Sequence, residues 1–158
     1  MRAKWMAAML FYGLSVLTAA PCAVAQDQDV AVVVNENNRV STITLAELRK
    51  VFAGERRSWA VGVPIKLVVR PPGTHEHMAL LKLLGLSESE YKQYWIAQVF
   101  RGEADSEPMS LPSVGMQMEA LTVFAGAITL VSEQDVKPGM KVIKVNDHMP
   151  GEAGYPLH

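Results

Sequence analysis

The run Val30-Ala31-Val32-Val33-Val34 constrains the fold more than any other segment of the chain. It carries no polar side chain, so both faces of the strand that it predicts must be covered. A strand of this kind lies in a parallel or mixed sheet, with other elements packed on each side. We therefore expect the rest of the chain to supply a layer of helices on both faces of one sheet.

Helix signals and further apolar runs alternate along the chain. Capping boxes over residues 44–47 and 87–90 mark two helix starts, because in each the hydroxyl and the carboxylate bond free amides of the first turn. Another helix is expected over residues 74–84, with Gly85 ending it. This alternation predicts an α/β fold, a three-layer sandwich about a mainly parallel sheet. The further predicted strands are residues 65–69, 127–131 and 141–145.

The spacing of apolar residues predicts which helix faces are buried. The helix that opens at the second capping box has Tyr91, Trp95 and Val99 on one face, and we expect that face to be buried. A further helix begins near Val114, and Gly126 is expected to end it.

The beginning of the chain has the pattern of a secretory signal. Two basic residues precede an apolar run over residues 5–20, and the small residues Ala-Val-Ala follow at 23–25. We expect residues 1–25 to be a cleaved signal peptide and residues 26–158 to form one domain in the periplasm. Because the apolar run is shorter than the ~18 residues expected of a spanning helix, no stable membrane insertion is predicted.

Composition excludes several classes of function. The chain has 15 Lys and Arg against 16 Asp and Glu, which argues against nucleic acid or an anionic membrane as a partner. Cys22 is the one cysteine and lies in the expected signal, so no disulfide or cysteine metal site is predicted. The sequence has no G-x-S-x-G elbow, phosphate loop or G-x-G-x-x-G motif, so neither catalysis nor a cofactor is expected.

The turn after residue 69 has the residue types of an oxyanion site. Arg70 follows an apolar strand, Gly73 lets a backbone approach a ligand closely, and Thr74 offers a hydroxyl beside the free N–H groups of a helix start. These three residues are therefore the predicted site for a small phosphate-like oxyanion. The alternative is that Arg70 pairs with a carboxylate and Thr74 serves only as a helix cap.

The neighbouring sequence His75-Glu76-His77 has residue types that bind metals, but its spacing does not favour a metal site. Helical residues two apart point in different directions, whereas paired metal ligands usually lie three or four apart. No metal site is predicted, and the histidines are expected to lie on a solvated helix face.

Arg56, Arg57 and Trp59 form a candidate partner-binding patch. Arg and Trp are favoured at the energetic centres of protein interfaces, and these three fall in a predicted loop. The alternative interpretation is that Trp59 fills the core and the two arginines are solvated.

Four groups of residues keep an order and a spacing that resemble a known family. They are Leu45-x-x-Leu48-x-x-x-Phe52-x-Gly54 with Trp59, Ile65 to Arg70 leading to Gly73-Thr74, Tyr94-Trp95 with Phe100-x-Gly102, and Gly126-Ala127-Ile128. Together they resemble the phosphate-type substrate-binding proteins of ABC transporters, which have the type II periplasmic-binding fold. The resemblance covers nearly all of the chain after residue 25.

The resemblance implies an exported protein related to solute capture, without catalysis. In two-lobed relatives an Arg followed by Ser-Gly-Thr supplies one lobe's share of the site, and Arg70, Gly73 and Thr74 match that element. Pro72 stands where the Ser would be. Since the chain resembles only the second lobe, the expected fold is one lobe of a type II periplasmic-binding protein.

The missing opposite wall of the cleft leaves two other functions open. One is a non-catalytic interaction module that docks on an envelope protein, with the oxyanion site empty. The other is a homodimer in which a second copy of the chain completes the cleft.

Overall fold

The computed structural model describes residues 28–60 and 62–158, so the expected signal over residues 1–25 lies outside the described residues. Its strands are β1 (Val30–Val34), β2 (Thr42–Ile43), β3 (Lys66–Val69), β4 (Met109–Ser110), β5 (Ala127–Ser132) and β6 (Lys141–Val145). Its helices are α1 (Leu45–Phe52), α2 (His75–Leu84), α3 (Glu88–Phe100) and α4 (Val114–Val123), with a short 3-10 helix at Glu133–Asp135. No helix among the described residues is long and apolar enough to cross a membrane.

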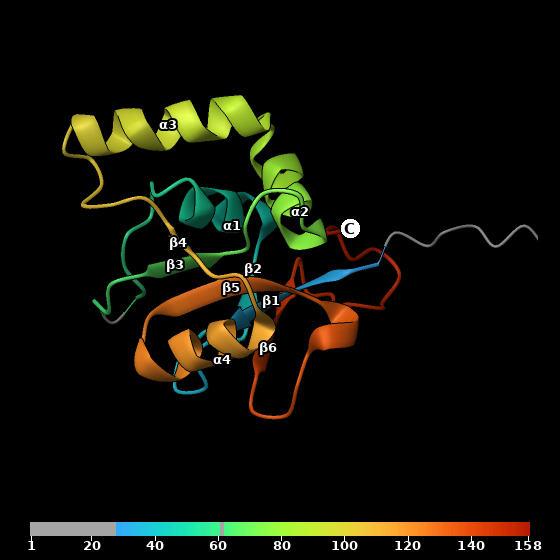
Figure 1. The fold of residues 1–158 in the computed structure, drawn as a ribbon. Helices are drawn as coiled ribbons and strands as arrows, with labels where there is room; N and C mark the ends of the chain where they lie inside the picture. The colour runs from blue at the N-terminus through green and yellow to red at the C-terminus, as the bar shows by residue number, and fades with distance from the viewer. Residues whose placement is uncertain (1–27, 61) are drawn as a thin grey trace, which may run out of the picture.

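The strands form one sheet between two helical layers (Figure 1). Their order is β2-β6-β1-β5-β3-β4. Helices α1 and α2 cover one face, α3 lies outside α1, and α4 covers the other face (Figure 1). The predicted three-layer α/β sandwich is thus confirmed.

The direction of the strands differs from the expectation of a mainly parallel sheet. β1 runs antiparallel to both of its neighbours, β5 and β6, whereas the other described pairs are parallel. The sheet is therefore mixed. An apolar run that is covered on both faces suits either direction, so the pattern of β1 did not determine it.

β1 divides the core into two parts. Val30, Val32 and Val34 pack with α1, α2 and α3, while Ala31 and Val33 pack with α4 on the opposite face. This alternation is what a pleated strand requires, and it confirms that β1 is covered on both sides.

The local helix signals are also confirmed. Both capping boxes form, with the Thr44 and Ser87 hydroxyls accepting from the amides of Glu47 and Glu90. Gly85 takes a left-handed conformation, with φ of 70°, and ends α2.

Two expectations about helix ends and faces are wrong. Val99 is 38% exposed, because α3 is an outer helix that buries only Tyr91 and Trp95. Gly126 does not end α4, which finishes at Val123. Instead, a Cβ at Gly126 would collide with the carbonyl oxygen of Pro64, so glycine is needed there for a close approach of two backbones.

The C-terminal segment is tied to the start of β1. The Tyr155 hydroxyl donates to the Val30 oxygen at 2.7 Å, and the Val30 amide donates to the Leu157 oxygen at 3.0 Å. Two parts of the chain that are distant in sequence are therefore held side by side.

Candidate functional site

The predicted oxyanion residues come together at the turn between β3 and α2. Thr74 is the N-cap of α2, and its hydroxyl accepts from the His77 amide at 3.3 Å and donates to the Pro71 oxygen at 2.9 Å. Gly73 is exposed and has φ of 86°, a conformation that favours glycine. Local sequence thus shapes the turn as expected, although the Thr74 hydroxyl is already engaged.

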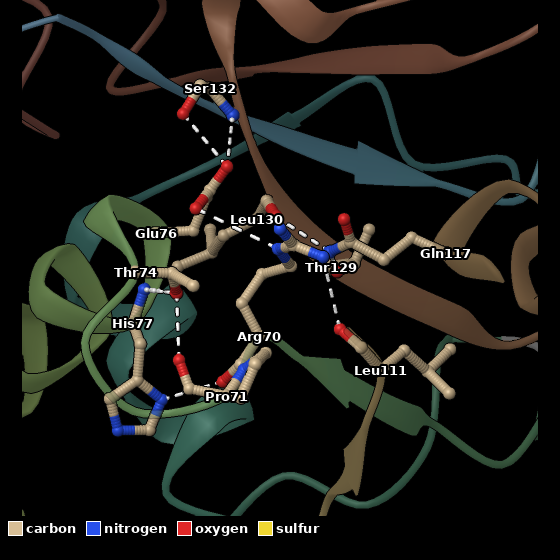
Figure 2. Close-up of polar contacts among 10 residues, drawn as sticks. All are labelled: Arg70, Pro71, Thr74, Glu76, His77, Leu111, Gln117, Thr129, Leu130 and Ser132. Carbon is tan, nitrogen blue, oxygen red and sulfur yellow. Dashed lines mark hydrogen bonds and ion pairs between the residues drawn. The ribbon is translucent and has the colours of Figure 1, made fainter. Parts of the chain in front are cut away.

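Arg70 points inward from the end of β3 and is only 14% exposed at its side chain. Figure 2 shows its contacts with Glu76 and Leu111. Nη1 donates to the Leu111 oxygen at 3.2 Å, and Nε lies 3.9 Å from Oε2 of Glu76. That separation exceeds a hydrogen bond, and Nε is buried without a hydrogen-bond partner among the described residues. The Nε–H of the guanidinium is therefore a buried donor without a hydrogen bond among the described residues.

Glu76 is the residue of this site that sequence reasoning missed. Its Oε1 accepts from the Ser132 hydroxyl at 2.8 Å and from the Ser132 amide at 3.3 Å, at the end of β5. Burial alone raises the pKa of Glu76, but hydrogen bonds from its own amide and from Ser132, with the Arg70 charge, outweigh burial and hold that pKa below its usual range. The buried carboxylate is therefore ionised at neutral pH.

A signal for Glu76 was present in the sequence. It is an acidic residue in the first turn of α2, where the helix dipole stabilises a negative charge. Its pairing with Ser132 across the sheet, however, depends on tertiary structure. The predicted oxyanion site therefore already has a negative charge beside it, the carboxylate of Glu76.

His77 also departs from expectation, because it is buried rather than solvated. Nδ1 lies 2.8 Å from the Arg70 oxygen and Nε2 lies 2.8 Å from Oε2 of Glu88, while the ring meets Tyr91 edge-on. The imidazole thus ties the turn to the start of α3. Within the described part of the chain, no group of three His, Cys, Asp or Glu side chains converges as a metal site would require.

A buried amide on α4 is bonded to β5. Gln117 is fully buried, and its Nε2 donates to the Thr129 hydroxyl at 2.6 Å and the Leu130 oxygen at 2.9 Å (Figure 2). These bonds fix α4 against β5.

The second predicted patch is only partly exposed. Trp59 is 3% exposed, and its indole nitrogen donates to the Gly126 oxygen at 3.1 Å, so the expected role of its ring in partner contact is corrected to a core role. Arg56 lies over that ring, 5.7 Å from its centroid, and Arg57 is exposed. Both arginines line a cavity of about 400 Å³ beside β3.

Comparison with known proteins shows a similarity in fold. No protein-family model matches the chain, and no curated protein matches it. Three solved structures match over 78% of the chain. They are an ABC-type phosphate transport receptor from Vibrio cholerae (20% identity, TM-score 0.62), a phosphate ABC transporter substrate-binding protein with bound phosphate from Clostridium perfringens (18%, 0.62) and PstS from Borrelia burgdorferi (14%, 0.58).

The matched region is about half of each of these structures, 48%, 47% and 49% respectively. The described residues thus have the fold of one lobe of a periplasmic-binding protein, and the resemblance expected from sequence is confirmed at the level of fold.

Proposed function

We propose, with one lobe of the periplasmic-binding fold as the premise, that this chain is an exported, non-catalytic solute-binding protein. Its ligand in this proposal is a small oxyanion, with phosphate the first candidate, held at Arg70, Gly73 and Thr74. The proposed mature domain is residues 26–158, released into the periplasm by cleavage after Ala25. Support comes from the phosphate-binding proteins of like fold and from the residue types at the turn.

The observation that carries the proposal is the inward guanidinium of Arg70. It stands at the end of β3 beside the first turn of α2, where the helix dipole adds positive potential. Its Nε lacks a hydrogen-bond partner among the described residues. A buried donor without a partner is costly, and a ligand oxygen would satisfy it.

Glu76 sets the expected affinity. Its carboxylate lies 3.9 Å from Arg70 Nε, so an arriving anion must compete with it for the guanidinium and is repelled by it. Each charge-assisted hydrogen bond contributes roughly 1.5–3 kcal/mol, and few remain available. We therefore expect affinity in the range of about 1 mM unless a partner covers the site.

The test is calorimetric titration of the exported protein with phosphate, sulfate and arsenate. Glu76→Gln keeps the shape of the side chain and removes its charge, so phosphate affinity is expected to rise on the order of tenfold. Arg70→Lys keeps the charge but loses the planar fork, so affinity is expected to fall. Arg39→Ala, at an exposed position away from the turn, is the matched control.

Two results would remove oxyanion capture as the function. One is no binding heat at millimolar phosphate in either the native protein or Glu76→Gln. The other is an unchanged affinity in Arg70→Lys.

A second candidate function is docking on an envelope protein. The observation that favours it is that Glu76 already occupies the oxyanion turn, while the exposed Arg57 has no carboxylate within ion-pair distance among the described residues. Co-purification from the native envelope tests it: loss of a stable partner in Arg57→Glu, but not in Arg70→Lys, supports docking. Retention of the partner in both variants contradicts it.

A further inference from the structure

His77 is a buried histidine to which oxyanion capture gives no role. Its side chain is 3% exposed and leaves the first turn of α2 toward the start of α3. Nδ1 lies 2.8 Å from the main-chain oxygen of Arg70, a contact drawn in Figure 2. Nε2 lies 2.8 Å from Oε2 of Glu88, the first residue of α3. The ring is therefore a direct contact between the oxyanion turn and α3.

Both oxygens that face the ring are hydrogen-bond acceptors. A main-chain oxygen carries no proton, and an ionised carboxylate only accepts. A neutral imidazole has one N–H group, so it can donate to one of the two oxygens and must turn a lone pair toward the other. The two short contacts form together when both ring nitrogens carry a proton. The geometry thus corresponds to a positively charged His77 beside a negatively charged Glu88.

The other charged and titratable groups near the ring are engaged elsewhere or stay neutral. Tyr91 of α3 meets the ring edge-on at 5.5 Å, and burial, with the charges of Glu88 and Glu107, raises the pKa of its hydroxyl. Three groups on α2 and the oxyanion turn are already bonded to other parts of the chain, and they are His75, Glu76 and Arg70. Glu88 is thus the charge that faces the ring directly.

Loss of one proton from the ring affects the Glu88 side of this contact. The Arg70 oxygen belongs to the backbone of a turn, whereas the Glu88 side chain is 49% exposed and can turn toward water. A lone pair on Nε2 that faces a carboxylate oxygen is an unfavourable contact of two acceptors. Since α3 is an outer helix that buries only Tyr91 and Trp95, few other contacts hold its start.

We propose that His77 is a proton-dependent latch, a contact that holds the start of α3 against the oxyanion turn while the ring is charged and releases it when the ring is neutral. Histidine is the side chain that changes its charge near neutral pH, so the latch closes as the pH falls and opens as the pH rises. This inference goes beyond oxyanion capture and is independent of it, because no ligand takes part.

The experiment is nuclear magnetic resonance of the ¹⁵N-labelled exported protein, without ligand, between about pH 5 and about pH 9. The ring ¹⁵N shifts of His77 count its protons. Amide hydrogen exchange at Tyr91, whose N–H donates to the Ser87 oxygen at 2.9 Å, measures how firmly the first turn of α3 is held. We expect a proton on both ring nitrogens at the acid end and on Nδ1 alone at the alkaline end. Over the same change, the protection factor of the Tyr91 amide is expected to fall on the order of tenfold.

Glu88→Gln is the test variant, because a Gln side chain can either donate to a neutral Nε2 or accept from a protonated one. The contact then survives in both states of the ring, and protection of the Tyr91 amide is expected to be independent of pH. Glu119→Gln makes the same chemical change at an exposed position on α4 and is the matched control, expected to behave as the native protein does. The amide spectrum reports whether each variant is folded.

The inference is overturned if Nε2 of His77 keeps the same protonation over the whole pH range, or if protection of the Tyr91 amide does not change as Nε2 loses its proton. The same pH dependence in Glu88→Gln as in the native protein also overturns it. A separate phosphate titration keeps the latch apart from oxyanion capture, because a failure to bind phosphate leaves all of these results unaltered.

Discussion

An arginine lies near each end of β3, and the two differ in burial and in whether a carboxylate faces them. At the carboxyl end, Arg70 is turned inward and faces the buried carboxylate of Glu76. Beside the other end, Arg57 is exposed, lines a cavity and has no carboxylate within ion-pair distance among the described residues. The comparison teaches that a residue type alone does not identify a binding site. What matters is whether its charge and its donors are already satisfied by the chain.

The largest expected difference between the two arginines is in how much each contributes to the stability of the protein. Arg70→Ala leaves the buried Glu76 charge without its cationic partner, and we expect the free energy of unfolding to fall by about 3 kcal/mol. Arg57→Ala is the matched change at the exposed end and is expected to alter stability by less than about 0.5 kcal/mol. Denaturant unfolding measures both. Similar losses in the two variants would break the comparison.

A smaller effect is expected on acidification. The pKa of Glu76 is lowered in the folded protein from an ordinary value of 4.5, so its contribution to stability is present above that value. The contribution is lost as the pH falls through the lower, folded pKa. We therefore expect Glu76→Gln to be less stable than the native protein at pH 6, with the difference shrinking toward pH 3. Chemical denaturation at each pH measures this difference in stability. A difference that stays constant between pH 6 and pH 3 would show that Glu76 is not a buried ion.

The smallest of these effects concerns the helix cap at the turn. Thr74→Ala removes the acceptor for the His77 amide and is expected to lower the free energy of unfolding by about 1 kcal/mol. Thr74→Ser keeps the hydroxyl and is the control. If Thr74→Ala has no effect on stability yet weakens phosphate binding, the hydroxyl serves the ligand rather than the helix.

Features encoded by neighbouring residues were predictable from sequence. The capping boxes at Thr44 and Ser87 and the left-handed Gly85 formed as expected, because each needs only contacts within a few residues. The buried strand β1 was predictable for the same reason, since its own side chains require cover on both faces.

Features that depend on distant partners were not predictable. The pairing of Glu76 with Ser132 and the burial of Trp59 against Gly126 join residues far apart in the chain. The direction of β1 relative to β5 likewise depends on the path of the whole chain. The cavity was missed because the route of residues 103–108 past β3 has no local signal.

The position of β1 also has a consequence for how the protein folds. The strand is made early, but both of its neighbours, β5 and β6, come from the last third of the described chain, and the segment that bonds Val30 comes later still. Pairing over such long sequence separations is slow. We therefore expect the sheet to form slowly, because β1 cannot pair until β5 and β6 are available, and such a delay would suit a polypeptide proposed to cross a membrane before it folds.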